Sequence, residues 1–137
     1  FGYIKTFGGR KCRFNKWEIA EWNNGKFTAP MSRADAEAAY YEKYPKATKP
    51  NIRRAFTYKA LNKLIQGSAA DMTKQAMLNL YREGIVPHIQ IHDELDISVE
   101  SEEQAKKIIE IMEEAVKLKI PNKVDYESGN NWGEING

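Results

Sequence analysis

The chain has 137 residues, of which 42% are hydrophobic and 29% charged, and its formal net charge is only +2. This composition is typical of one globular domain with a modest core, and no apolar run approaches the roughly 20 residues of a membrane-spanning helix. The single cysteine, Cys12, excludes an internal disulfide. Basic residues concentrate in the first half and acids after Glu83. A basic first half is compatible with phosphate binding and equally with a solvated basic surface.

The first 31 residues predict a hairpin followed by an irregular stretch. Residues 2–14, GYIKTFGGRKCRF, carry aromatic and apolar side chains on both sides of Gly8 and Gly9. Paired glycines favour a tight turn because they adopt positive φ readily. Residues 15–31 combine tryptophans, asparagines and a glycine without a clear period, and we expect them to be irregular.

Helices are predicted next. Ser32, with an acid three residues on, resembles a capping box and predicts a helix over 33–44, which the prolines of YPKATKP end. A second helical pattern covers 52–62. The Gly67-Ser68 pair is expected to interrupt it and to start a further helix, which Gly84 ends.

The remaining residues predict an α+β unit. Period-2 alternation indicates two strands, at about 86–92 and 95–100. Ser101 begins an amphipathic helix that Pro121 stops, and residues 123–128, KVDYES, predict a third strand. We therefore expect a small antiparallel sheet, made of the hairpin and the C-terminal strand, with packed helices.

A polar triplet stands where the two alternating strands meet. Asp93 and Glu94 lie beside His92 in QIHDEL. Adjacent strand residues point to opposite faces, so at most one of the two carboxylates faces a given site. A carboxylate suits Mg²⁺, but two-metal phosphoryl chemistry needs at least one further acid. His88 lies four residues earlier, ~13 Å away along a strand, which excludes a shared zinc. An acidic turn in water is the alternative.

Two amides share a spacing in the preceding helix. Asn62 and Gln66 are four residues apart, so a continuous helix places both on one face. Paired amides can hydrogen-bond to base edges or to the sugar-phosphate backbone. A solvated polar stripe is the alternative.

Four stretches together resemble family A DNA polymerases, the DNA polymerase I type. LNKLIQGSAADMTKQAM is similar to the family's helix block, and QIHDEL to its third polymerase motif. GYIKTFGGR resembles the hairpin that follows the fingers, and SGNNW the terminal Gly-x-Asn-Trp. The four matches come in family order and span nearly the whole chain.

The resemblance implies roles for the site residues. Asp93 would bind the catalytic Mg²⁺ ions of nucleotidyl transfer, and Glu94 would support it. His92, Asn62 and Gln66 would contact the primer-template near its growing end. Partners would be primer-template DNA and a deoxynucleoside triphosphate, with no membrane, in the cytoplasm of a bacterium or a phage-infected host cell.

The departures from the family pattern are also informative. The motif with the second metal-binding aspartate and the fingers helix that holds the nucleotide are not found. The family's usual arginine four residues before the asparagine is Tyr58 here, so Arg53, Arg54 or Lys59 is expected to supply the phosphate contact. The stretch from 17 to 50 is longer than in bacterial enzymes and looks more like a phage version.

We therefore interpret 1–137 as the C-terminal palm portion of such a polymerase, with a hairpin over 1–14, a variable insertion over 15–50 and palm helices and sheet over 51–137. It would be one piece of a split or excised enzyme, inactive alone and completed by an N-terminal fragment. Two alternatives remain: a non-catalytic nucleic-acid-binding or assembly module, and a metal-dependent phosphoesterase. The latter would recruit Glu94, Asp96 or Asp125 beside Asp93.

Overall fold

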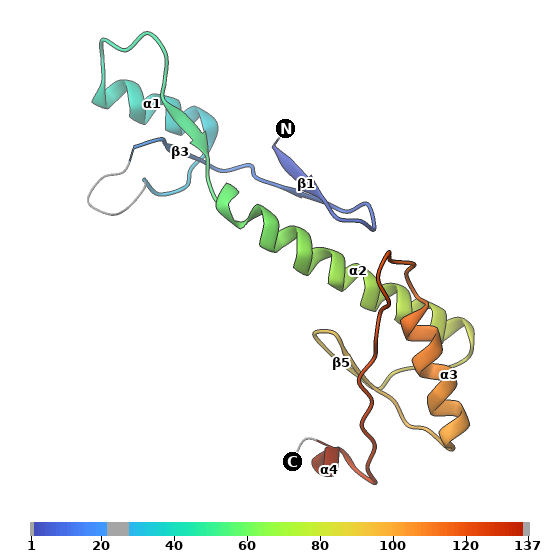
Figure 1. The fold of residues 1–137 in the computed structure, drawn as a ribbon. Coiled ribbons are helices and arrows are strands. Elements are labelled where there is room, and N and C mark those ends of the chain that lie inside the picture. The colour runs from blue at the N-terminus through green and yellow to red at the C-terminus, as the bar shows by residue number, and fades with distance from the viewer. Residues whose placement is uncertain (1, 22–27, 136–137) are drawn as a thin grey trace. The chain divides into compact units, whose positions relative to one another are not determined.

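A computed structural model describes residues 2–21 and 28–135. The chain divides into two compact units, Phe1–Gly67 and Ser68–Gly137 (Figure 1). The division falls inside the long helix α2, Ala60–Arg82. None of the helices in the described ranges is long and apolar enough to cross a membrane.

The first unit opens with the predicted hairpin. β1, Tyr3–Lys5, pairs antiparallel with β2, Lys11–Arg13. Gly9 has a φ of +91° in the connecting turn, a conformation that glycine adopts without steric cost. Its N–H donates to the Thr6 carbonyl at 2.9 Å. The sequence-based hairpin is confirmed.

A second two-stranded sheet follows, covered by a helix. β3, Trp17–Ile19, pairs antiparallel with β4, Ile52–Arg54, and α1, Arg33–Lys43, packs on both strands. Ser32 caps α1 by accepting the Asp35 N–H, as predicted.

Two expectations in this unit are corrected. The irregular stretch over 15–31 contains β3 and a bridge between Trp17 and Met31, while its part over 22–27 lies outside the described residues. The helix expected from 52 begins only at the 3₁₀ turn Thr57–Lys59. In both places a strand forms because it pairs with a segment far away in the sequence, and local sequence patterns carry no information about such pairing.

Helix α2 is continuous through Gly67, so the expected interruption and the Ser68 cap are wrong. A Cβ at Gly67 would lie 2.8 Å from Thr6 Cγ2, which means that the glycine serves close packing of the hairpin rather than a break. The helix ends as predicted at Gly84, whose φ is +77°. Bonds from Gly84 N to Tyr81 O and from Ile85 N to Leu80 O form a Schellman motif.

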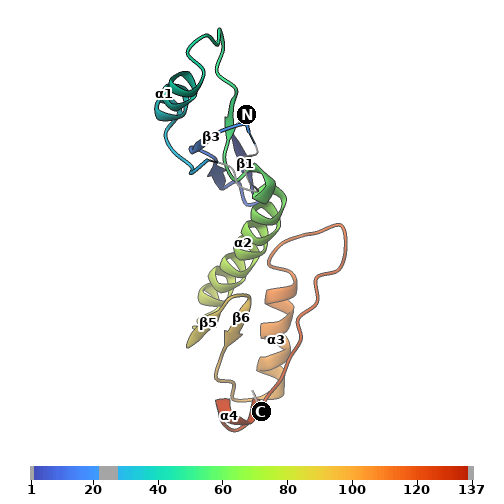
Figure 2. The ribbon, with the colours of Figure 1, turned by 90° about the vertical axis from the view of Figure 1, so that its left-hand side faces the viewer.

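The second unit contains the polar hairpin and an amphipathic helix. β5, Ile89–Ile91, pairs antiparallel with β6, Glu94–Asp96. α3, Glu102–Glu113, lies beside this hairpin in both Figures 1 and 2. Ser101 Oγ accepts the Gln104 N–H, which confirms the predicted start of α3. The α+β class is confirmed.

The third strand predicted over 123–128 is absent. The Val124 N–H donates to the Glu113 carboxylate at 3.0 Å, so at this residue a side chain replaces a strand partner. The terminal SGNNW stretch leads into a single helical turn, α4, Trp132–Ile135. Asn131 Oδ1 accepts the Glu134 N–H at 3.2 Å and caps this turn.

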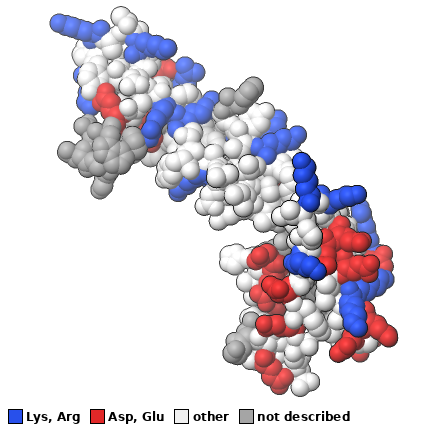
Figure 3. Space-filling model, in the orientation of Figure 1, with Lys and Arg blue, Asp and Glu red and all other residues white. Residues whose placement is uncertain are grey.

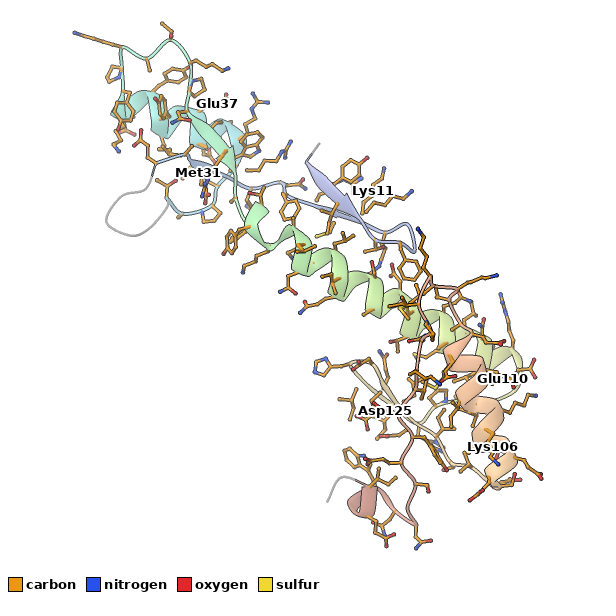
Figure 4. All side chains as sticks on the ribbon, viewed as in Figure 1. Lys11, Met31, Glu37, Lys106, Glu110 and Asp125 are labelled. Atoms are coloured by element: carbon orange, nitrogen blue, oxygen red, sulfur yellow. The ribbon has the colours of Figure 1, made fainter. Side chains whose placement is uncertain are left out.

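Small apolar cores hold each unit. In the first, the buried apolar side chains are Phe14, Ile19, Ala36 and Ala55; in the second they are Ala76, Leu80, Ala105 and Ile108. Lys106 and Glu110, labelled in Figure 4, lie on the exposed side of α3. Alternation of buried and charged positions along α3 is the pattern that its sequence predicted.

Candidate functional site

The first two residues of the polar triplet form a two-residue turn at the tip of the β5–β6 hairpin, and the third begins β6. Ile91 pairs with Glu94, which leaves His92 and Asp93 as the loop. His92 has a φ of +54°, in the left-handed region that tight hairpin turns require. Histidine is one of the few non-glycine residues enriched there. The Gln90 amide donates to the His92 carbonyl at 3.0 Å and helps to hold the turn.

The carboxylates of this turn are available to an external partner. His92, Asp93 and Glu94 are all exposed. Neither Asp93 nor Glu94 accepts a side-chain hydrogen bond or forms an ion pair with any residue of the described ranges. These carboxylate oxygens are therefore available as metal ligands, since no group in the part of the chain that the structure describes binds them.

The strands that carry the turn are less covered than predicted. The cross-strand register places Ile89, Ile91, Glu94 and Asp96 on one face. Ile89 is 45% and Ile91 38% exposed, although their alternation indicated a half-buried strand. On the same face Asp96 Oδ2 is buried and has no hydrogen-bond partner in the described part of the chain. This face therefore combines exposed apolar area with an unsatisfied acid.

No group of three or more metal-ligating side chains exists within 2–21 and 28–135. The oxygen chemistry of Asp93 and Glu94 suits a hard cation such as Mg²⁺. Two neighbouring carboxylates nevertheless leave most coordination positions unfilled. The turn can supply some of the ligands of a divalent-metal site, and further ligands are needed to complete the site. The phosphoesterase alternative, which needs the chain to close the site with its own acids, finds no support in this donor set.

In the first unit, the start of α2 brings the two amides together. Asn62 and Gln66 lie on one face of the continuous helix, as predicted, and both are exposed. Leu61 and Ile65 flank them and are 66% and 60% exposed. A helix face that mixes exposed amides with exposed large apolar side chains can bind a partner that offers both polar edges and apolar surface.

The three basic residues predicted beside these amides differ in their surroundings. Arg53 Nε donates to the nearly buried Glu18 carboxylate at 2.7 Å. Arg54 donates to the Phe14 carbonyl at 2.6 Å, and its guanidinium lies 4.6 Å from the Trp17 ring centroid. Both arginines thus connect β4 to neighbouring segments.

Lys59 has a different environment. Its ammonium lies 5.5 Å from the Phe56 ring and 5.6 Å from the Tyr58 ring. Tyr58 is 76% exposed. Lys59 is therefore an accessible cation just before α2.

Sequence reasoning missed one contact next to Gln66. The Arg10 guanidinium, from the hairpin, donates to the Gly67 carbonyl at 2.9 Å. The available signal was the glycine inside an otherwise helical pattern, which indicates close approach of another segment.

Charge differs between the two units. On the face drawn in Figure 3, the first unit carries patches of Lys and Arg with few acidic atoms, while most of the acidic atoms lie on the second unit beside some lysines. In the second unit Lys107 binds Glu83 at 2.7 Å, and this hydrogen bond lowers the pKa of the Glu83 carboxyl.

A family model described as DNA polymerase family A matches residues 2–134. The chain belongs to this family. It is 35% identical over 136 residues to a DNA-directed DNA polymerase of Pseudomonas phage M6, covering 99% of this chain and 16% of the phage protein. It is 41% identical over 85 residues to DNA polymerase I of Borreliella burgdorferi, covering 56% of this chain and 9% of that protein.

A third family member, DNA polymerase I of Bacillus caldotenax, is 40% identical over 91 residues, with 60% of this chain and 10% of that protein covered. The 137 residues thus span a small part of the family A polymerases that they match. No solved structure is significantly similar to the chain.

Proposed function

We propose that the 137 residues form the C-terminal palm portion of a DNA-directed DNA polymerase, in which Asp93 supplies one of the acids that hold catalytic Mg²⁺. The observation that supports this proposal is the exposed Asp93 carboxylate on a tight hairpin turn, in a chain of family A. This carboxylate has no hydrogen-bond or ion-pair partner among the described residues. Such a turn suits the task because flanking strands hold a carboxylate in place more precisely than a loop does.

Bound Mg²⁺ would supply the positive charge that stabilises the attacking primer oxygen and the pyrophosphate leaving group. The contribution of this chain is a carboxylate ligand from Asp93, with Glu94 beside it in a supporting role. The second metal-binding acid and the residues that grip the nucleotide lie outside these 137 residues in this proposal. Completion by an N-terminal polymerase portion then makes the active enzyme.

Contacts to the primer-template are assigned to Asn62, Gln66 and His92. The two amides can donate and accept hydrogen bonds at base edges or sugar atoms. Leu61 and Ile65 provide the apolar surface beside them, and His92 adds an imidazole at the metal-binding turn. Exposure of all five side chains supports an external ligand.

Phosphate contacts are assigned to Arg53, Arg54 and Lys59. Lys59 is well suited to this role because its ammonium lies over two exposed rings and forms no ion pair with any described residue. Arg53 and Arg54 also bind Glu18 and Phe14, so replacing both would weaken β4 as well as DNA binding. The reaction places the protein with replicating DNA, in the cytoplasm of a bacterium or a phage-infected host.

The test is reconstitution. The 137-residue chain is combined with a polymerase portion that carries the fingers and the second acid, and Mg²⁺-dependent primer extension is measured. Asp93→Asn should reduce the rate at least about a hundredfold, since metal stabilisation is worth several kcal/mol and each ~1.4 kcal/mol is tenfold. Glu94→Gln should cost less.

Asp125→Asn is the matched control, because Asp125 is an exposed acid of the same unit on the segment after α3 (Figure 4). It should leave extension and complex formation unchanged. Retention of most activity by Asp93→Asn, with the control behaving normally, would show that the turn aspartate does not hold the metal.

A further inference from the structure

The end of α1 carries a concentration of aromatic rings. The Tyr40 and Tyr44 ring centroids are 5.0 Å apart with planes inclined by 42°, and Tyr41 meets Tyr40 edge-on at 6.1 Å. An open hollow of about 450 Å³ is lined by Tyr40, Lys43, Tyr44, Pro45, Lys46 and Ala47. The rings and the proline make its wall mainly apolar.

Lysines border this hollow. Lys46 lines the hollow, and Lys49 follows the lining residue Ala47 by two positions. Both are exposed and form no ion pair with any residue of the described ranges. No acidic residue occurs between Glu42 and Asp71, although lysine and arginine recur there. The hollow therefore stands in a strongly basic stretch, which attracts an anionic ligand.

The ring of Tyr44 is held in place through its hydroxyl. Its hydroxyl donates to Glu21 Oε2 at 2.9 Å, and the Lys43 ammonium binds the same oxygen at 2.8 Å. The bond from Lys43, and then that from Tyr44, lowers the pKa of the Glu21 carboxyl. Glu21 thereby neutralises Lys43 and leaves Lys46 and Lys49 as the cations available to a ligand.

We propose that this surface, made of Tyr40, Tyr41, Tyr44, Lys46 and Lys49, binds single-stranded DNA. Aromatic faces accept bases by stacking without sequence preference, and lysines at their edge bind the phosphates between bases. The site uses residues other than the proposed palm contacts and adds a binding surface for unpaired template. It extends the proposed function, but its test measures binding alone and does not depend on polymerisation.

The test titrates the 137-residue chain against a short fluorescein-labelled oligothymidylate and follows anisotropy. Tyr44→Leu should weaken binding roughly tenfold because it removes a stacking face. Tyr44→Phe should keep affinity within about twofold, since it retains the ring and loses only the Glu21 bond. Equal losses in these two variants, or no loss in either, would overturn the stacking role.

Charge is tested separately. K46A/K49A should reduce the slope of log K against log salt by about 1.4, or about 0.7 for each lost phosphate contact to a single strand. K117A/K119A, which removes two exposed lysines of the second unit, is the matched control and should leave the slope unchanged. An equal change in both double variants would refute the site, and circular dichroism confirms that each variant is folded.

Discussion

Replacing Gly67 by alanine tests how the hairpin is docked on α2. The new Cβ would lie 2.8 Å from Thr6 Cγ2 and 3.9 Å from Arg10 Nη2. Thr6 is only 5% exposed, so its methyl group has little room to move. The substitution should push the turn away from the helix and lengthen the bond from Arg10 to the Gly67 carbonyl.

Two opposing effects decide the size of the change in unfolding free energy. Alanine is better than glycine inside a helix by about 0.5–1 kcal/mol. Overpacking costs roughly 1–3 kcal/mol, and weakening an exposed hydrogen bond adds about 0.5 kcal/mol. The steric cost is larger than the propensity gain, so Gly67→Ala should destabilise the chain by about 1 kcal/mol.

Thr6→Ser provides the matched background because it removes the clashing methyl and keeps the hydroxyl. That hydroxyl accepts the Arg10 N–H at 3.0 Å. With the methyl gone, Gly67→Ala should become stabilising, and only its helix-propensity gain of about 0.5–1 kcal/mol should remain. Urea unfolding of the wild-type chain, both single variants and the double variant, followed by circular dichroism, measures this coupling.

The sign of the effect is the decisive result. Stabilisation by Gly67→Ala in the wild-type background would show that the hairpin yields easily and that Gly67 has no packing role. An unchanged effect in the Thr6→Ser background would show that Thr6 Cγ2 is not the limiting contact. Either outcome would refute close packing as the reason for this glycine.

Further substitutions test other parts of the chain. Gly84→Ala should destabilise it by about 1–2 kcal/mol, measured by urea unfolding, because φ is +77° and nothing lies within 4 Å to compensate or clash; no loss would argue against the Schellman motif. Lys107→Ala should reduce stability at neutral pH. Because the Glu83 pKa is lowered in the folded state, this difference should be present above about pH 4.3, the ordinary glutamate value, and vanish as pH falls through the lowered pKa. A difference that persists in strong acid would contradict this. Lys59→Ala should reduce the salt slope of duplex binding by about 0.9, and an unchanged slope would remove Lys59 from the interface.

The sequence by itself determined those elements whose signals are local. The Gly9 turn, the Ser32 and Ser101 caps and the Gly84 helix end depend on φ preferences and on side chains within a few residues. The existence of the hairpin turn was also readable from the alternation on both sides. Its exact position was not, because the strands predicted over 86–92 and 95–100 placed the loop at 93–94, whereas the structure has it at His92 and Asp93. These features needed no information from distant segments.

Tertiary structure decided the features that depend on partners far along the chain. β4 is a strand because it pairs with β3. The paired residues Glu18 and Arg53 are 35 positions apart in the sequence. Residues 123–128 are not a strand, and the Val124 N–H is bound by a glutamate of α3. Helix α2 runs through Gly67 without a break, and the hairpin packs into the space that a side chain at this position would fill. Hydrogen-bond pairing and close packing are properties of two segments together, and neither segment's own sequence encodes them.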